Sequence, residues 1–230
     1  MQRYLIWDFD GTLGYREGGW TGALFDILRQ EMPLCEVTAE PLRLHRQTGV
    51  PWHTPDQPHT TITSADQWWD ALDPIFERAF SGVGITVPRA RQMAKQVRQR
   101  YPHLAAWRLF EDTIPALARL SAQGWTHMIL SKHVPELPSI IHHLQLGEYM
   151  SQLFNSAETG YEKPPPQAFH KVLDARDGRA AVWMIGDSIK ADVTGAALAG
   201  IPSILVRTHH PDAPYGCSKL SQVFALINTV

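Results

Sequence analysis

The sequence predicts an α/β protein with a doubly wound parallel sheet and a helical domain inserted after the first strand. Beyond about residue 106, short apolar runs alternate with helical patterns, which is typical of βαβ units in a parallel sheet. One further apolar run, residues 5–7, lies far upstream, and residues 15–105 break the rhythm. We therefore expect a core of residues 1–14 and 106–230 and a helical domain of residues 15–105.

Residues that commonly begin or end helices predict the bounds of the helices and strands in the core. A helix begins after Asp112 and ends at Gly124, because glycine commonly ends helices, and the prolines at 164–166 can open another helix. The expected strands cover residues 125–130, 154–156, 182–185 and 203–206. The expected helices between them cover residues 137–144, 164–173 and 191–199.

The inserted segment is predicted to be helical, with no strand pairing. The expected helices cover residues 21–31, 41–47, 64–80 and 88–101, with a loop rich in proline and histidine at 49–63. Ser64 and Thr86 are expected to cap the third and fourth helices, and Pro74 to kink the third. Adjacent helical residues point in different directions, so we expect one of Trp68 and Trp69 to be buried and the other partly exposed.

Composition narrows the class of protein. Hydrophobic residues make up 44% and charged residues 19% of the chain, with a net charge of -2, which is ordinary for a soluble protein and gives no electrostatic case for nucleic acid. No apolar run approaches the roughly 20 residues of a membrane span. Cys35 and Cys217 lack metal-type spacing and favour a reducing compartment. We expect a cytoplasmic protein, monomer or homodimer, without nucleic-acid or membrane partners.

Two carboxylates follow the first strand. Asp8 and Asp10 are two residues apart, so their side chains point to the same side, at the strand end where open α/β sheets bind ligands. Ser131, Lys163 and Asp187 follow later strands of the same expected sheet. Each alone has an ordinary explanation as a strand-end hydroxyl, a solvated charge or a helix cap. Together they suit Mg²⁺, which prefers oxygen ligands, beside a phosphoryl group.

Four segments stand in an order that resembles the haloacid dehalogenase (HAD) superfamily. They are DFDGTL at 8–13, Ser131, KPPPQAF at 163–169 and GDSIKAD at 186–192. The insertion between the first and second motifs resembles the helical C1-type cap of subfamily IA. The resemblance implies a Rossmann-like HAD core with an inserted α-helical cap domain.

The resemblance also implies roles for individual residues. Asp8 would attack phosphorus, and Asp10 would protonate the leaving oxygen and later activate water. Mg²⁺ would be held by Asp8, the backbone carbonyl of Asp10 and Asp187. The phosphoryl oxygens would be bound by Ser131 and Lys163, joined by Gly11, Thr12 and Lys132. Asp192 and Ser188 would not contact the substrate. Asp192 would orient Lys163 or metal-bound water, and Ser188 would support the site in the same indirect way.

The expected activity is therefore Mg²⁺-dependent hydrolysis of a small organic phosphate monoester through an aspartyl-phosphate. Asp10 argues against dehalogenation, because the dehalogenases of the family lack an acid at that position. A phosphosugar mutase and a non-catalytic phosphometabolite-binding protein stay open as alternatives. Lys132, where the family usually has asparagine, either adds a positive charge for an anionic substrate or faces solvent.

The substrate is not readable from the sequence, since the cap determines it. The residues that could contact the substrate are Arg16, Trp20, Arg43, His45, Arg46, Trp52 and His53. The fourth predicted helix carries several arginines and Lys95 without an acid, which favours a solvated face over attraction of phosphate esters. The histidines show no metal-ligand spacing and are expected to be surface or core residues.

Overall fold

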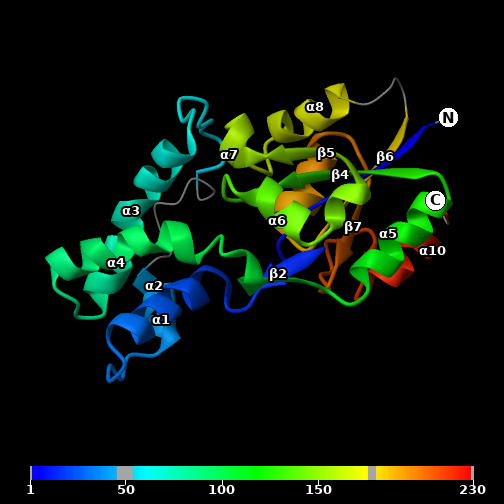
Figure 1. The fold of residues 1–230 in the computed structure, drawn as a ribbon. Coiled ribbons are helices and arrows are strands. Elements are labelled where there is room, and N and C mark those ends of the chain that lie inside the picture. Colours follow the sequence, from blue (N-terminus) through cyan, green and yellow to red (C-terminus); the bar gives the residue numbers. More distant parts are fainter. Residues whose placement is uncertain (1, 46–53, 176–179, 229–230) are drawn as a thin grey trace.

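A computed structural model describes residues 2–45, 54–175 and 180–228. Its centre is a parallel sheet of six strands in the order β5-β4-β1-β6-β7-β8, with helices packed around it in Figure 1. The strands are β1 (Arg3–Trp7), β4 (Trp125–Ser131), β5 (Met150–Asn155), β6 (Ala181–Gly186), β7 (Ser203–Val206) and β8 (Gly216–Cys217). The chain runs outward from β1 to β4 and β5, then crosses to β6 on the other side. The predicted doubly wound α/β core is confirmed.

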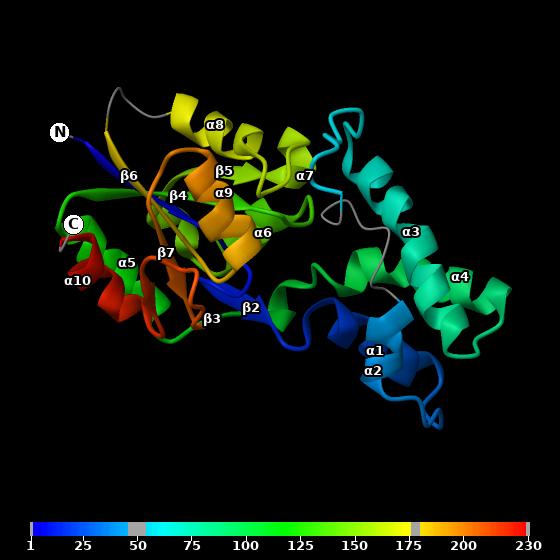
Figure 2. The ribbon, with the colours of Figure 1, turned by 180° about the vertical axis from the view of Figure 1, so that it is seen from behind.

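The two faces of the sheet are covered by different helices (Figures 1 and 2). Tyr4 and Ile6 of β1 pack with α8 (Pro166–Asp174) and α9 (Gly195–Leu198). Leu5 and Trp7 point to the opposite face, because side chains alternate along a strand, and they belong to the larger hydrophobic cluster. The helices on that face are α5 (Thr113–Ala122), α6 (Leu137–His143) and α10 (Val223–Ile227). Full burial of each such aliphatic side chain contributes roughly 1.5–3 kcal/mol.

The helices between residues 19 and 100 form a lobe beside the sheet, which we call the helical lobe (Figure 1). It consists of α1 (Gly19–Glu31), α2 (Ala39–His45), α3 (Ala65–Gly82) and α4 (Val87–Arg100). Ser64 caps α3 as expected, since its hydroxyl accepts a hydrogen bond from the Gln67 N–H at 3.2 Å. Thr86 precedes α4, but its side chain makes no capping bond. Pro74 lies inside α3.

A short antiparallel ribbon leads into and out of the helical lobe. β2 (Gly14–Arg16) pairs with β3 (Trp107–Leu109). The prediction that residues 15–105 contain no strand pairing is therefore wrong for Tyr15 and Arg16. Strands of three residues are too short to show a period in the sequence, so only the pairing partner defines them.

Both adjacent tryptophans of α3 are buried, which contradicts the expectation that one is partly exposed. Trp68 is 4% and Trp69 is 1% exposed. Trp20 of α1 packs against both rings, with centroid separations of 6.5 and 6.1 Å. The indole Nε1 of Trp69 also donates a hydrogen bond to Glu136 Oε1 at 2.9 Å. Because Glu136 precedes α6, this bond joins the helical lobe to the sheet lobe.

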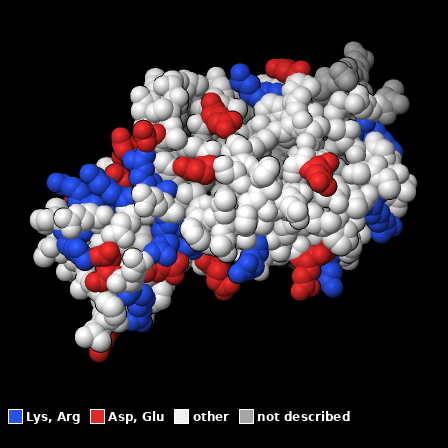
Figure 3. All heavy atoms as spheres, in the orientation of Figure 1, with Lys and Arg blue, Asp and Glu red and all other residues white. Residues whose placement is uncertain are grey.

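Three of the four arginines of α4 form ion pairs with acids on neighbouring helices, and Arg100 donates to Gln30 Oε1. Arg91 contacts Glu77 at 3.0 Å, Arg89 contacts Glu31 and Arg98 contacts Asp66. Blue and red atoms accordingly lie side by side over this lobe in Figure 3. The expected solvated face is thus a paired face, although exposed pairs of this kind contribute only about 0–1 kcal/mol each.

Several core boundaries differ from the prediction. The strand expected at 154–156 is β5, which starts at Met150, and Ser156 begins the short helix α7 (Ser156–Thr159). The helix expected at 191–199 starts earlier, with a π-helical turn, η4 (Ile189–Thr194), before α9. β8 and α10 were not predicted. The 3₁₀ turns are η2 (Leu104–Ala106), η3 (Leu146–Glu148) and η5 (Leu220–Gln222). Within the described ranges, the helices are all too short or too polar to cross a membrane.

Candidate active site

Asp8 lies at the carboxyl end of β1, where the sheet reverses its winding. β1 pairs in parallel with β4 on one side and β6 on the other, so that Trp7 stands level with Ile129 and Ile185. The Asp8 N–H donates to the Ile185 carbonyl at 2.9 Å. Strand ends at such a reversal frame the crevice of open α/β sheets, which places Asp8 at its centre.

Lys163 is the cation of this crevice. It is 1% exposed, and its Nζ lies 3.1 Å from Asp8 Oδ1 and 2.6 Å from Asp192 Oδ1. Burial alone would lower the pKa of Lys163, but Asp192 and then Asp8 outweigh it and raise that pKa. Lys163 is therefore a permanent positive charge beside Asp8.

Ser131 and Lys163 contact the same oxygen of Asp8. The Ser131 hydroxyl donates to Oδ1 at 2.9 Å, as does the ammonium at 3.1 Å. Within the described part of the chain, no donor contacts Oδ2. The two donors fix the orientation of the Asp8 carboxylate, so that Oδ2 is left for a ligand.

Three carboxylates gather at this point. Asp8, Asp187 and Asp192 each offer an oxygen, and these oxygens lie within 4.8 Å of one another. Asp192 is fully buried and already engaged, because it accepts from Lys163 and, at 3.0 Å, from the Ser188 N–H. Among the described residues, no donor of another residue contacts Oδ2 of Asp8 or the carboxylate of Asp187, and a Cβ on Gly11 would clash with Asp187. This donor set of oxygens fits Mg²⁺.

Crowding alters the protonation of the remaining acids. Burial, followed by the charges of Asp8 and Asp187, raises the pKa of Asp10 to about 7. Burial, followed by the charges of Asp8 and Asp192, raises the pKa of Asp187 to about 7 as well. Pairs of acidic side chains whose pKa values lie near 7 are typical of sites that move protons or bind cations.

These residues surround a cavity of about 200 Å³ between the two lobes. It is lined by Asp8, Asp10, Trp20, Tyr101, Ser131, Lys132, His133, Asp187, Ser188 and Ala191. Trp20 was a predicted substrate contact, whereas Tyr101 and His133 were not recognised. Tyr101 stacks on Trp20 with ring centroids 3.6 Å apart, and only the packing of α1 against the end of α4 reveals this. His133 follows Ser131 closely in sequence, which was the one available signal.

Three predicted phosphate-binding residues do not line the cavity, and one of them is Lys163, whose Nζ contacts Asp8 and Asp192 instead. Gly11 and Thr12 are absent from the described residues that line the cavity. Their backbone N–H groups donate within the loop, to the carbonyls of Gly14 at 2.8 Å and Phe9 at 3.2 Å. The tight turn after Asp10 therefore uses these donors for its own structure, and we assign them no phosphate contact.

Three other predicted substrate contacts, Arg16, Arg43 and His45, are also absent from the described residues that line the cavity. Arg16 is buried against Asp26 at 2.9 Å. Arg43 pairs with Glu40 at 2.6 Å on the exposed side of α2, and His45 lies against Gly82 of α3. Arg46, Trp52 and His53 fall outside the described residues.

The fold and this carboxylate-lysine site define a class of hydrolase, and comparison with known proteins gives the same result. A family model described as haloacid dehalogenase-like hydrolase matches residues 3–200. The chain belongs to this family.

Individual similarities agree with the family. A phosphoserine phosphatase of Thermus thermophilus is 31% identical over 61% of this chain and 56% of its own length. The chain spans 56–60% of the length of its first two curated relatives. The HAD-hydrolase YfnB of Bacillus subtilis shares the fold at a TM-score of 0.73, with 18% identity and 99% coverage of both chains. A subfamily IA hydrolase of Geobacter sulfurreducens does so at 0.63, with 18% identity and 98% and 96% coverage.

Proposed function

We propose that this protein is a Mg²⁺-dependent phosphatase that hydrolyses a small organic phosphate monoester through an aspartyl-phosphate on Asp8. The observation that carries the proposal is the position of Asp8 between Lys163 at 3.1 Å and the free carboxylate of Asp187. A nucleophilic carboxylate must approach an anionic phosphoryl group. The ammonium of Lys163 on one side, and a metal ion that Asp187 would hold on the other, would make that approach feasible.

Two acids that follow β1 have different roles in the proposed reaction: Asp8 is the nucleophile and Asp10 is the general acid and base. Asp8 Oδ2 attacks phosphorus while Ser131 and Lys163 hold Oδ1 in place. Asp10, whose pKa of about 7 leaves it partly protonated at neutral pH, donates a proton to the leaving alkoxide. It then takes a proton from the water that cleaves the acyl phosphate. An acid with a pKa near the working pH is best suited to both transfers.

Asp8, Asp187 and the backbone carbonyl of Asp10 would hold the metal ion. When bound, Mg²⁺ supplies charge that offsets the repulsion between the Asp8 carboxylate and the phosphate. Asp192 keeps Lys163 in position from behind, and Ser188 in turn keeps Asp192 in place. Lys132, which also lines the cavity, adds a positive charge at its wall.

Relatives support phosphate esters as substrates. Besides the phosphoserine phosphatase, they include proteins named ribulose-1,5-bisphosphate 5-phosphatase, from Halopiger xanaduensis, and pyrimidine 5'-nucleotidase, from Escherichia coli. The helical lobe, residues 15–105 in our division of the chain, acts as the cap. Trp20 and Tyr101 come from this segment and line the cavity beside Asp8, where they exclude water from the reaction.

A panel of phosphate monoesters tests the proposal. In a buffer with about 5 mM Mg²⁺, we expect the protein to release free phosphate from p-nitrophenyl phosphate. We expect a higher kcat/KM for at least one small metabolite ester than for p-nitrophenyl phosphate. Release is to be measured with and without EDTA. An isomerised sugar phosphate without free phosphate would select the mutase instead. Stabilisation by esters without turnover would select a binding protein.

The acid pair also predicts how stability depends on pH and metal. Without metal, Asp10 and Asp187 hold their protons to about pH 7 in the folded chain, against an ordinary value of 3.8. Between these values the folded chain binds more protons than the unfolded chain, so the free energy of unfolding falls as pH rises. Below about pH 6.5 the buried His127 and His133 oppose this trend, because their pKa values are lowered to about 4 and 3 and they take up protons on unfolding. We therefore expect Tm in EDTA to decrease between about pH 6.5 and pH 8, where only the two acids still exchange protons on unfolding.

Mg²⁺ should reverse this trend, because it binds the ionised carboxylates. At about 100 times Kd it adds roughly 2.7 kcal/mol, or on the order of 5–10 °C in Tm for a chain of this size. The rise in Tm on adding Mg²⁺ should be larger at pH 8 than at pH 5.5. These two pH values lie about one unit or more on either side of the pKa that Asp10 and Asp187 have in the folded chain. Thermal melts of the wild type and of Asp187→Asn measure it. An equal Mg²⁺ response in Asp187→Asn would argue against the metal site.

A further inference from the structure

A strained arginine follows β7, at the edge of the loop that carries Asp10. Arg207 has φ 68°, and among the described residues only Gln145 shares a left-handed backbone without being glycine. This conformation is unfavourable for a residue with a Cβ. It persists where surrounding contacts hold the residue in place, so the contacts of Arg207 indicate what the strain serves.

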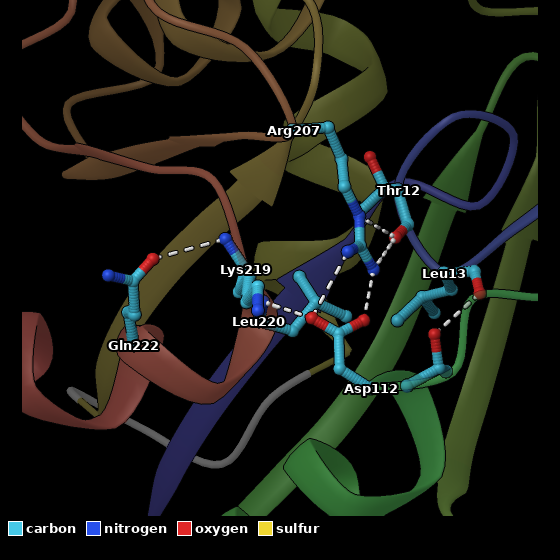
Figure 4. Close-up of polar contacts among 8 residues, drawn as sticks. Thr12, Leu13, Asp112, Arg207, Lys219, Leu220 and Gln222 are labelled. Carbon is cyan, nitrogen blue, oxygen red and sulfur yellow. Dashed lines mark hydrogen bonds and ion pairs between the residues drawn. The ribbon is translucent and has the colours of Figure 1, made fainter.

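The guanidinium of Arg207 joins two segments that are far apart in sequence, as Figure 4 shows. Its Nε and Nη2 donate to the carbonyl oxygen of Thr12 at 3.2 and 3.0 Å. Its Nη1 and Nη2 donate to the two carboxylate oxygens of Asp112 at 3.1 and 2.7 Å. The group also lies 4.0 Å from the centre of the Phe110 ring. One face of this planar cation and all three of its nitrogen atoms are therefore engaged, in the forked geometry that suits arginine and not lysine.

Asp112 is itself held in place. Its Oδ2 accepts from the Leu220 N–H at 2.8 Å, and it precedes α5. Burial raises the pKa of Asp112, but the hydrogen bonds from Arg207 and Leu220 outweigh it and lower that pKa. The carboxylate is thus an ionised anchor, fixed to the C-terminal segment, against which the guanidinium rests.

Thr12 and Asp10 belong to the same turn, which is closed by backbone hydrogen bonds. The Phe9 carbonyl accepts from the N–H groups of Leu13 at 2.9 Å and Gly14 at 3.1 Å, and Gly11 N–H donates to Gly14 at 2.8 Å. A second anchor is the Thr113 hydroxyl, which donates to the Leu13 carbonyl at 2.7 Å. A displacement of Thr12 would therefore carry Asp10 with it.

We propose that Arg207 is a positioning residue for the proposed phosphatase reaction. It holds the Thr12 carbonyl, and through the closed turn of residues 9–14 it fixes the Asp10 carboxyl against the leaving oxygen. Arg207 does not line the cavity that contains Asp8 and Asp10, so it acts through the loop and not on the substrate. A misplacement of about 1 Å at a reacting group can lower turnover on the order of 100-fold.

The decisive variant is Arg207→Gly, because glycine adopts the left-handed backbone without strain. This change removes the guanidinium and relieves the backbone, so the fold is protected while the loop loses its anchor. With p-nitrophenyl phosphate and Mg²⁺ we expect kcat to fall on the order of 100-fold, with KM within about threefold of the wild type. Arg207→Lys keeps the charge but not the fork, and its kcat should fall roughly tenfold.

Gln145→Gly is the matched control. Gln145 is exposed and left-handed at φ 57°, and it is absent from the described residues that line the cavity, so the variant reproduces the backbone change without touching the loop. Its kcat should equal that of the wild type. If Arg207→Gly is folded and keeps kcat within about threefold, the proposal is wrong. A loss of kcat that is matched by an equal rise in KM would also overturn it.

Hydrogen exchange of the turn separates this proposal from the proposed function, on which it rests. We expect amides of residues 11–14 to exchange at least about tenfold faster in Arg207→Gly than in Gln145→Gly, because their local opening loses its restraint. If the wild type releases no phosphate, the proposed function fails, and unchanged exchange then also rejects Arg207 as the anchor of the loop. Faster exchange in a protein without turnover retains the anchor and rejects only the reaction.

Discussion

Asp8→Asn should abolish phosphate release while leaving the fold intact. Asparagine has the same shape and still accepts hydrogen bonds from Ser131 and Lys163, but its amide cannot attack phosphorus. We expect kcat to fall at least about 10⁴-fold, as when the nucleophile of a covalent mechanism is removed. Turnover of p-nitrophenyl phosphate, followed to the detection limit, measures the loss.

Stability gives the internal control for this variant. The substitution removes one of the crowded carboxylates that raise the pKa values of Asp10 and Asp187, which offsets the weaker bonds to Lys163. Tm in EDTA should therefore stay within a few degrees of the wild type. Asp174→Asn changes an exposed acid of α8 and should leave both quantities unchanged. Asp8→Asn activity within about tenfold of the wild type would contradict the assignment of the nucleophile.

Lys163→Met should have the largest effect on stability. Lys163 and Asp192 are 1% and 0% exposed, and removal of the lysine leaves Asp192 and Asp8 as buried charges without their cation. Breaking a buried pair in this way costs about 3–5 kcal/mol. Denaturant unfolding at pH 8, about a unit above the pKa values of the site, gives the free energy of unfolding directly. We also expect kcat to fall on the order of 100- to 1,000-fold.

A double variant separates the structural from the chemical contribution. In Lys163→Met with Asp192→Asn, the buried charge is removed together with its partner, and the asparagine oxygen can still accept from the Ser188 N–H. The free energy of unfolding should recover in part, whereas turnover should not. Recovery of both would show that Lys163 serves only to neutralise Asp192. An unchanged free energy of unfolding in the single variant would contradict the buried ion pair.

Much of the core followed from the sequence for a simple reason. The strand at 203–206 was predicted with the bounds that the structure has, because Gly200 and Pro202 interrupt the pattern just before it. Asp8, Ser131 and Asp187 come together because each stands at the end of a parallel strand of one sheet. Lys163 joins them from the loop before α8. Glycine and proline residues at the ends of elements, together with the rules of parallel sheets, are sufficient to predict such features from the sequence.

What could not be predicted depends on contacts between distant segments. The β2–β3 ribbon exists only because residues near 15 and 108 pair. Trp68 is buried against Trp20 of α1, which periodicity within α3 does not reveal. The bond from Arg207 to Thr12 spans 195 positions. An arginine after a strand carries no local sign of such a partner.

The larger hydrophobic cluster runs without a break from Leu5 and Trp7 of the sheet, through Phe9 and Trp107, to Tyr101 and Phe76 of the helical lobe. Two lobes that share one apolar interior cannot melt independently, since loss of either exposes the aromatic rings at their junction to water. Cooperativity therefore extends over the whole chain. An excision of the helices would strip the sheet of part of its own core, so the insertion has become a structural requirement of the domain that it interrupts.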